Sequence, residues 1–421
     1  ANDAHYYLTL ASQVAHDGDY ANTGVAAGGA HGATAYFPPA FPYLLAAVDA
    51  IDGHRIPGGA AVEPARLTQA VLGTVSVGLV GLVALEIFGV TVALLALAIA
   101  AIYPPLVALS GSVYSENLLI PLILAAIWAA LRARRSGTPY RWVAVSGVLI
   151  GLATLTHQNG IVVVFALLPA VWSIRRAPLL LIGLTVLTIA PWTIRNAVVM
   201  HSFIPVSDET GFTIAGTYNP TSAHDPRIPY RWRYLQVIPA DAALAREAHR
   251  FTEPRLGSKL QHVAFSYIGH HPLAPLAAAY HNTRRLLDLE GSFAWRASTY
   301  NIGVPRSTAR AGVLGSWVLA LLAVCGAFTA AARRAPRWLW ITPLFLYLSV
   351  VFVNAETPRF RAPIDPFLIM LAACALAGAL AHVRAKAARR SDRGAPVGRD
   401  ELRAPTAGSV SQLVEMGQGR A

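Results

Sequence analysis

Nine apolar runs divide the chain, and polar segments separate them. A helix needs about 20 apolar residues to cross a hydrocarbon core of roughly 30 Å, and these runs are long enough to cross it, or most of it when tilted. The pattern predicts an all-α polytopic membrane protein with about nine visible transmembrane helices. The run 161–172 is short enough for a re-entrant or broken segment. The runs are Leu67–Phe88, Val90–Leu109, Asn117–Leu131, Trp142–Thr156, Ile161–Trp172, Leu179–Val199, Val313–Ala330, Leu339–Val353 and Phe367–Val383.

The composition supports a membrane protein. Of the 421 residues, 55% are hydrophobic and only 13% are charged, whereas soluble domains carry about 25% charged residues. This shortage of polar surface excludes an ordinary soluble enzyme, a disordered regulator and a disulfide-stapled secreted module. The two cysteines, Cys325 and Cys374, lie within apolar runs, so we expect neither a disulfide framework nor a zinc site.

The net charge is +12, and many of the basic residues are arginines that border the apolar runs. Basic residues in this position indicate the cytoplasmic side of a membrane protein, and we expect no nucleic-acid partner. When the runs alternate sides, the arginines at 132–141, 175–176 and 333–337 and those of the C-terminal tail share one face, which we assign to the cytoplasm. The sequence thus predicts an integral protein of the plasma (inner) membrane.

This topology divides the chain into five regions. We expect a first extracytoplasmic loop with amphipathic helices (1–66), a transmembrane bundle (67–199), a long extracytoplasmic loop with interfacial helices (200–310), C-terminal transmembrane helices (311–383) and a disordered basic cytoplasmic tail (384–421). Interfacial helices are predicted at 3–15, 240–250 and 260–268. Because the chain begins outside with no inserting segment before it, we expect that an N-terminal transmembrane signal-anchor helix precedes this sequence.

Acidic residues are scarce, and two of them fall at the outer face. Asp3 opens the first outer loop, and Glu116 stands where the chain re-enters the membrane. A carboxylate at a membrane boundary is partly desolvated, which raises its pKa and suits it to proton abstraction. The alternative is that both residues cap helices or occupy a first helical turn, where the helix dipole favours an acid.

Three arginines, Arg195, Arg359 and Arg361, lie at the outer ends of apolar runs. A planar guanidinium can donate two hydrogen bonds to one phosphate, so these residues are candidates for holding a lipid-linked phosphate. The alternative is that they extend to lipid headgroups, as arginines at span ends commonly do.

Other polar signals are weaker. The topology makes His157-Gln158-Asn159 an outer turn, and a plain hairpin loop is the favoured interpretation. Asp17-Gly18-Asp19 has a spacing that binds divalent ions, but Asp-Gly also ends helices, and we favour a turn. The sequence contains no phosphate-binding Gly-rich loop, no His-Glu-x-x-His pair and no Gly-x-Ser-x-Gly elbow.

Several short segments follow one another in a familiar order. They are Asp3-Ala4-His5-Tyr6-Tyr7-Leu8, Gly18-Asp19-Tyr20, 38–45, Ser115-Glu116-Asn117-Leu118, 151–157, Pro191-Trp192-Thr193-Ile194-Arg195-Asn196, 203–207 and 359–366. Together they resemble the polytopic glycosyltransferases of the GT-C fold, in particular the protein O-mannosyltransferase and aminoarabinose-transferase superfamily. The likeness extends from the first residues to about Val383.

The resemblance implies an inverting transfer of a hexose or pentose from a polyprenyl-phosphate donor to a lipid, glycan or protein acceptor. Asp3 falls on the family's general base and Glu116 on its second acidic position. Further candidates for substrate binding are Arg195, Arg359, Arg361, Tyr6, His157 and Asn196. The family often has Glu where this chain has Ala4, and Arg-Pro where it has His157-Gln158. We expect no cofactor and no tightly held metal, although some relatives use one.

Two other functions remain open at this stage. A transporter or flippase of lipid-linked saccharides would carry charges along a path through its spans, and Glu86 is the main candidate for such a charge. A polymerase of lipid-linked repeat units would share the outer site and would release a pyrophosphate carrier. An enzyme is favoured because the acids otherwise gather outside.

Overall fold

A computed structural model of the chain describes residues 3–23, 29–52, 62–295, 305–355 and 357–394. Within these ranges the fold is helical and contains no strand, only two isolated bridges, one between Ala21 and Ala33 and one between His31 and Thr252. The chain forms two compact units, residues 1–378 and 379–421. The described part of the second unit is the last portion of α19 (Asp365–Gly394).

Each predicted apolar run coincides with a helix or a helix pair. The helices are α3 (Val62–Phe88), α4 (Val90–Ile102), α5 (Pro104–Ser110), α6 (Glu116–Ala133), α7 (Pro139–Thr156), α8 (Val162–Val171), α9 (Ala177–Val199), α16 (Arg306–Ala327), α18 (Arg337–Val351) and α19. Of the described helices, five are long and apolar enough to cross a membrane: α3, α6, α9, α16 and α19. The helical runs are confirmed, while nine crossings and their orientation stay predictions.

The pair α4 and α5 makes a sixth candidate span, bent by 59°. The bend lies at Tyr103, which has an extended backbone because it precedes Pro104. Proline has no amide hydrogen to donate and starts a new helix at this point. The chain then reaches Glu116 through a short turn.

Helix α6 lies at the centre of the bundle, and 72% of its residues are buried. Its neighbour α7 packs closely on α9 because α7 carries glycines there. A Cβ on Gly147 would lie 2.8 Å from the carbonyl oxygen of Leu181, and one on Gly151 would lie 2.5 Å from Cβ of Thr188. Small residues at such crossings let helix backbones approach each other, as in many membrane bundles.

The predicted helix at 3–15 is confirmed as α1 (Asp3–Asp17), which buries Tyr6, Tyr7 and Leu10. It ends at Gly18, whose φ of 73° is the left-handed conformation that glycine adopts at helix ends, so the favoured turn is present. Helix α2 (Ala40–Asp52) follows and packs against α1.

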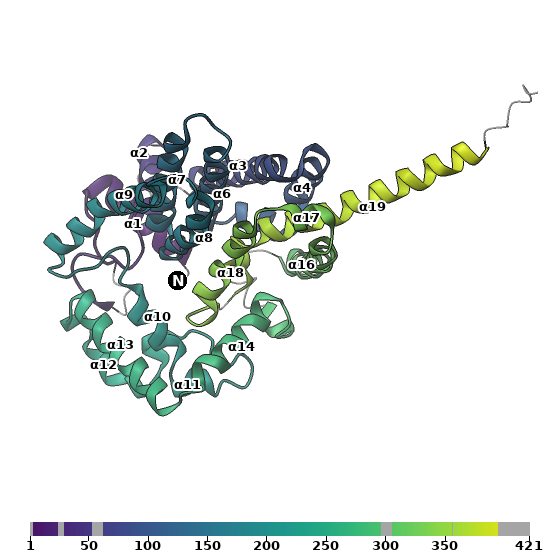
Figure 1. The fold of residues 1–421 in the computed structure, drawn as a ribbon. Coiled ribbons are helices and arrows are strands. Elements are labelled where there is room, and N and C mark those ends of the chain that lie inside the picture. The colour runs from purple at the N-terminus through teal and green to yellow at the C-terminus, as the bar shows by residue number, and fades with distance from the viewer. Residues whose placement is uncertain (1–2, 24–28, 53–61, 296–304, 356, 395–421) are drawn as a thin grey trace, which may run out of the picture. The chain divides into compact units, whose positions relative to one another are not determined.

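The long loop folds into a group of short helices, visible in green at α11–α14 in Figure 1. Its members are α10 (Glu209–Thr217), α11 (Pro220–Ala223), η3 (Leu235–Val237), η4 (Pro239–Asp241), α12 (Ala242–Glu247), η5 (Ala248–Arg250), α13 (Glu253–His270) and α14 (Ala274–Leu286). Helices at 240–250 and 260–268 were predicted and are present. Their place at a membrane surface stays a prediction.

A buried carboxylate fixes the long loop against the first loop. Glu253 accepts hydrogen bonds from the Thr34 hydroxyl at 2.6 Å and from the Ala35 amide at 2.7 Å. The Asp208 amide donates to the Ala35 carbonyl at 3.0 Å. These contacts bring the start of α10 beside the first loop, although about 170 residues separate them in the sequence.

The tail differs from the expectation at its start. Residues 384–394 continue α19 as helix instead of being disordered. The helix persists because residues 379–389 are rich in alanine and arginine, which have high helix propensity. The remainder of the predicted tail, 395–421, lies outside the described residues, as do 53–61 of the first loop.

Candidate active site

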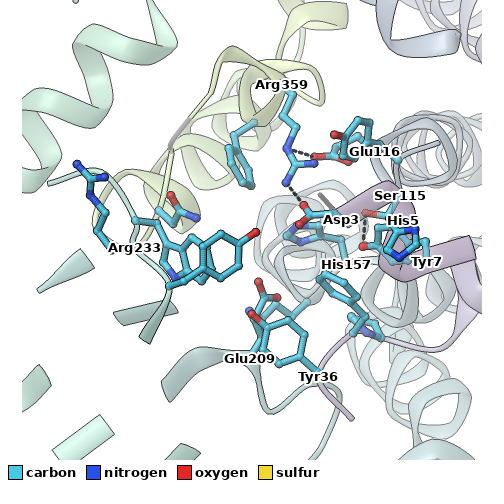
Figure 2. Close-up of a pocket in the computed structure, with 18 of the residues that line it drawn as sticks. Asp3, His5, Tyr7, Tyr36, Ser115, Glu116, His157, Glu209, Arg233 and Arg359 are labelled. Atoms are coloured by element: carbon cyan, nitrogen blue, oxygen red, sulfur yellow. Dashed lines mark hydrogen bonds and ion pairs between the residues drawn. The ribbon is translucent and has the colours of Figure 1, made fainter. Parts of the chain in front are cut away.

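A cavity of about 740 Å³ lies between the first loop, the ends of α6 and α7, and the long loop. Figure 2 shows its labelled side chains converging from these separate segments. Polar and aromatic residues form its wall. They are Asp3, His5, Tyr7, Tyr36, Phe37, Pro38, Tyr114, Ser115, Glu116, His157, Gln158, Glu209, Arg231, Trp232, Arg233, Tyr234, Val237, Asn354, Arg359 and Phe360.

Two carboxylates share one arginine at this cavity. Arg359, in η6 (Pro358–Arg361), donates a hydrogen bond to Asp3, and its Nε lies 3.5 Å from Oε1 of Glu116. Asp3 is the first residue of α1 and Glu116 the first residue of α6, positions where the helix dipole favours a negative charge. The two acids and the arginine therefore meet at one cavity (Figure 2), and the face of the membrane on which they lie stays a prediction.

The two carboxylates differ in access. The side chain of Asp3 is 37% exposed, whereas that of Glu116 is 4% exposed. Asp3 can therefore meet a substrate in the cavity more directly, while Glu116 lies behind it against Arg359. The guanidinium is also stacked on Tyr114, with 4.4 Å between its central carbon and the ring centroid. The ring and the two carboxylates fix its orientation.

Arg359 keeps its charge in this position. Burial disfavours a cation, but Asp3 and Glu116 outweigh that effect and raise the pKa of the guanidinium well above its ordinary value. A permanently charged planar donor is thus held at the cavity wall, where it can bind an anion.

Glu209 is a third acid at the cavity that the sequence reasoning missed. It begins α10, and its amide donates to the Ser207 hydroxyl at 3.1 Å. Burial raises its pKa to about 8, with a further increase from Asp3 and an opposing effect from Arg359. At neutral pH the carboxyl is mainly protonated and can donate a hydrogen bond. The available signal was the acidic pair 208–209, directly after a segment that carries the resemblance.

His157 also lines the cavity, in the turn after α7. The Asn159 amide donates to its Nδ1 at 3.5 Å, and η2 (Gln158–Ile161) continues the chain into α8. Burial lowers the pKa of the imidazole below its ordinary value of 6.5, which Glu116 partly opposes. The imidazole is therefore neutral at pH 7. The predicted turn is thus present and brings a polar ring to the site, while its place at the outer face stays a prediction.

Three predicted binding residues do not line the cavity. Arg195 donates to the backbone carbonyls of Thr34 and Tyr20, at 2.8 Å each. Asn196 is buried and donates to a carbonyl of the long loop, and Tyr6 is buried among aromatic rings of the first loop. Arg195 thus fastens the first loop to α9, and Asn196 links α9 to the long loop. None of the three side chains lines the cavity.

Arg361 likewise lies away from the large cavity. It forms ion pairs with Asp288 and Asp365, both at 3.0 Å, and donates to the carbonyl of Leu286. It borders a separate, mainly apolar space of about 80 Å³ between α5 and α16. Its charge is already neutralised by two carboxylates that are almost fully buried.

The described residues contain no group of three His, Cys, Asp or Glu side chains arranged to hold a metal ion. Asp3 and Glu116 both form ion pairs with Arg359. The Asp17-Gly18-Asp19 segment lies outside the cavity lining.

Comparison with protein families gives one match. Residues 37–194 match the model of the dolichyl-phosphate-mannose-protein mannosyltransferase family. This segment includes Glu116 and His157 but not Asp3, Glu209 or Arg359. No curated protein matches the chain.

Solved structures with a similar fold include the oligosaccharyltransferase of Archaeoglobus fulgidus. Its form tethered with an acceptor peptide has a TM-score of 0.55 and 15% identity, covering 96% of this chain and 48% of that one. The oligosaccharyltransferase AglB of the same organism, in complex with an inhibitory peptide and a dolichol-phosphate, has a TM-score of 0.50 and 14% identity. That match covers 96% of this chain and 49% of AglB. This chain thus spans about half the length of the oligosaccharyltransferase.

ArnT of Cupriavidus metallidurans bound to undecaprenyl phosphate has a TM-score of only 0.39 at 14% identity, covering 89% of this chain and 73% of that one. That likeness is too low to add to the argument. Over residues 37–194 the chain is therefore similar to the dolichyl-phosphate-mannose-protein mannosyltransferases, and its helical fold is similar to that of the archaeal oligosaccharyltransferase.

Proposed function

We propose that the protein transfers a sugar from a polyprenyl-phosphate carrier to an acceptor hydroxyl at the extracytoplasmic face of the membrane, with inversion. The observation that carries this proposal is the guanidinium of Arg359, held between Asp3 and Glu116 on the wall of a cavity large enough for a sugar. The matched family, named for a dolichyl-phosphate mannose donor, supports the choice of carrier.

Asp3 would serve as the general base. As the acceptor oxygen forms its bond to the anomeric carbon, its proton passes to the Asp3 carboxylate. The bond between the anomeric carbon and the phosphate oxygen breaks on the opposite face, and the electron pair leaves with the carrier phosphate. An acceptor hydroxyl has a pKa far above 7, so a positioned base is worth about 10²–10⁴ in rate.

Arg359 would stabilise the leaving phosphate. Its fork of donors fits two phosphate oxygens, and its orientation is already set by Glu116 and the Tyr114 ring. Binding of the phosphate would draw the guanidinium from Asp3 and leave that carboxylate free to accept the proton. Glu116, more buried, would keep Arg359 in place.

Protonated Glu209 would face the substrates as a neutral donor. A third ionised acid beside Asp3 would repel the carrier phosphate, whereas a protonated carboxyl can donate a hydrogen bond to a sugar oxygen. Neutral His157 adds a second uncharged polar group to the same wall.

The test is transfer by protein reconstituted in nanodiscs. Polyprenyl-phosphate-linked [14C]mannose and [14C]arabinose serve as donors, with envelope membranes as the acceptor source. We expect the Asp3→Asn variant to lose about 10²–10⁴ of the transfer rate while its melting temperature stays unchanged. Asp19→Asn, an exposed acid of the same loop outside the cavity, is the matched control.

Wild-type rates in the Asp3→Asn variant would overturn the mechanism. Release of a pyrophosphate carrier with a lengthened glycan would instead identify a polymerase, and movement of lipid-linked sugar without bond cleavage would identify a flippase.

A further inference from the structure

The cavity has a second wall, formed by the segment 231–237 of the long loop. Figure 2 shows Arg233 of this segment across the open space from Ser115, Glu116 and Tyr7. Two rings of the segment line the cavity, Trp232 and Tyr234, which we call the aromatic wall. Their centroids lie 4.6 Å apart with an edge-to-face angle of 71°.

The aromatic wall is held rigidly by α10. The Trp232 indole donates to the Phe212 carbonyl at 3.3 Å, and the Arg233 amide donates to the Gly216 carbonyl at 3.0 Å. A Cβ on Gly216 would lie 2.3 Å from Nε1 of Trp232, so the indole occupies the space that any larger residue would fill. The Trp232 ring therefore has a fixed position before any substrate arrives, which lowers the entropic cost of binding.

Packing alone does not account for these rings. The Tyr234 side chain is 46% exposed although it borders a polar cavity. The residue between the two rings, Arg233, forms an ion pair with Asp225 and points away from Glu209 and Asp3 (Figure 2). The segment thus brings two aromatic rings to the cavity, and Asp225 pairs with the charge of Arg233.

We infer that the acceptor is a saccharide whose ring stacks on the aromatic wall and presents a hydroxyl to Asp3. This inference rests on the proposed transfer function and names its acceptor class. Sugar rings have an apolar C–H face and a polar edge, and they match a site that joins aromatic surface with a few placed polar groups. Asp3 and protonated Glu209 supply an acceptor and a donor for such an edge.

A peptide is the alternative acceptor, because the oligosaccharyltransferase of similar fold is solved with an acceptor peptide. The experiment below distinguishes the two acceptor classes. The position of the carrier phosphate also determines the side from which the acceptor approaches the anomeric carbon. The carrier phosphate belongs at Arg359, so the acceptor must come from across the cavity, where the aromatic wall lies.

The experiment compares acceptors and wall variants in nanodiscs with a radiolabelled polyprenyl-phosphate donor. The acceptors are octyl mono- and disaccharides in one set and Ser/Thr-containing peptides in the other. We expect transfer to the octyl saccharides. Tyr234→Ala should raise the KM for the saccharide about threefold to tenfold and leave the KM for the donor unchanged. Trp232→Phe, which keeps a ring face, should be milder than Trp232→Ala.

Tyr280→Ala is the matched control, because Tyr280 is 59% exposed and lies outside the cavity lining. Saturation-transfer NMR of octyl saccharides on the Asp3→Asn protein measures binding without catalysis, and Tyr234→Ala should weaken it. Transfer to peptides alone, or an unchanged saccharide KM in Tyr234→Ala, would overturn the inference and leave the proposed function standing. Failure of every acceptor and of envelope membranes to consume donor would refute the proposed function itself.

Discussion

Two arginines of η6, Arg359 and Arg361, each lie between two carboxylates, yet their surroundings differ. Arg359 joins Asp3, which is 37% exposed, to Glu116 at the wall of the large cavity. Arg361 joins Asp288 and Asp365, whose side chains are only 4% and 1% exposed. The first cluster borders a cavity of about 740 Å³, whereas the second borders a mainly apolar space of about 80 Å³.

The difference shows that a guanidinium between two carboxylates can bind a substrate where a cavity reaches it, and can stabilise the fold where its partners are buried. At Arg361 every partner is supplied by the protein, so the ion pairs hold α14, η6 and α19 together. At Arg359 one partner remains open to the cavity and can be exchanged for a phosphate. The sequence does not distinguish the two arginines, because they lie two residues apart in the same short polar segment between apolar runs.

The largest expected effect is on catalysis at the open cluster. Arg359→Met should reduce transfer by about 10²–10³, because the leaving phosphate loses its fixed cation. Arg359→Lys should recover part of the rate, since it restores the charge without the planar fork. Initial rates in nanodiscs give the measurement. A Met variant as active as wild type would show that Arg359 is structural like its neighbour.

The closed cluster should respond in stability. Arg361→Met leaves two buried carboxylates without a cation, and we expect it to cost about 3–5 kcal/mol of unfolding free energy. Thermal denaturation in detergent measures this loss. Adding Asp288→Asn and Asp365→Asn to the same protein should restore much of the stability. A stable Arg361→Met protein whose KM for the donor is raised would instead place Arg361 in the binding site.

A smaller effect concerns pH. Glu209 has a pKa of about 8, so it ionises as the pH rises through that value and adds a negative charge beside Asp3. We expect the transfer rate to fall above about pH 8, and Glu209→Gln to abolish that fall. A pH–rate profile of both proteins decides the matter. An alkaline decline that persists in the Gln variant would assign it to another group.

The same residue has a stability signature of defined sign. Folding raises the pKa of Glu209 from its ordinary value of 4.5 to about 8. The native protein therefore binds more protons than the unfolded chain between about pH 4.5 and about pH 8. The free energy of unfolding should therefore decrease as the pH rises through this window. Glu209→Gln should flatten this part of the dependence, which melting curves at several pH values can test.

The smallest effect is expected at the aromatic wall, which lines the same cavity as the Arg359 cluster. Gly216→Ala places a methyl group against Trp232 and should raise the acceptor KM a few-fold without changing the donor KM. Gly78→Ala, where a Cβ meets open space, is the control. An equal change in both KM values would indicate general disorder of the site instead of a displaced indole.

Several elements of the site could be predicted from the sequence because they depend on local pattern. The spacing of Tyr6, Tyr7 and Leu10 predicted α1, and the scarcity of acids drew attention to Asp3 and Glu116. Glu209 was missed because it belongs to a long polar loop in which acids are less unusual. Its significance arises only when Glu253 fixes that loop against residues 34–35.

The sequence by itself determined the helices, the apolar membrane character and a short set of chemical candidates, since these follow from composition and from periods of a few residues. Only the tertiary structure decided which arginine meets the carboxylates at a cavity. Arg359 and Asp3 are 356 residues apart, and Arg195 and Arg361 share the same local setting at span ends. Their different roles depend on which distant backbone carbonyls and carboxylates the fold places beside them, because a guanidinium binds whichever acceptors lie within reach.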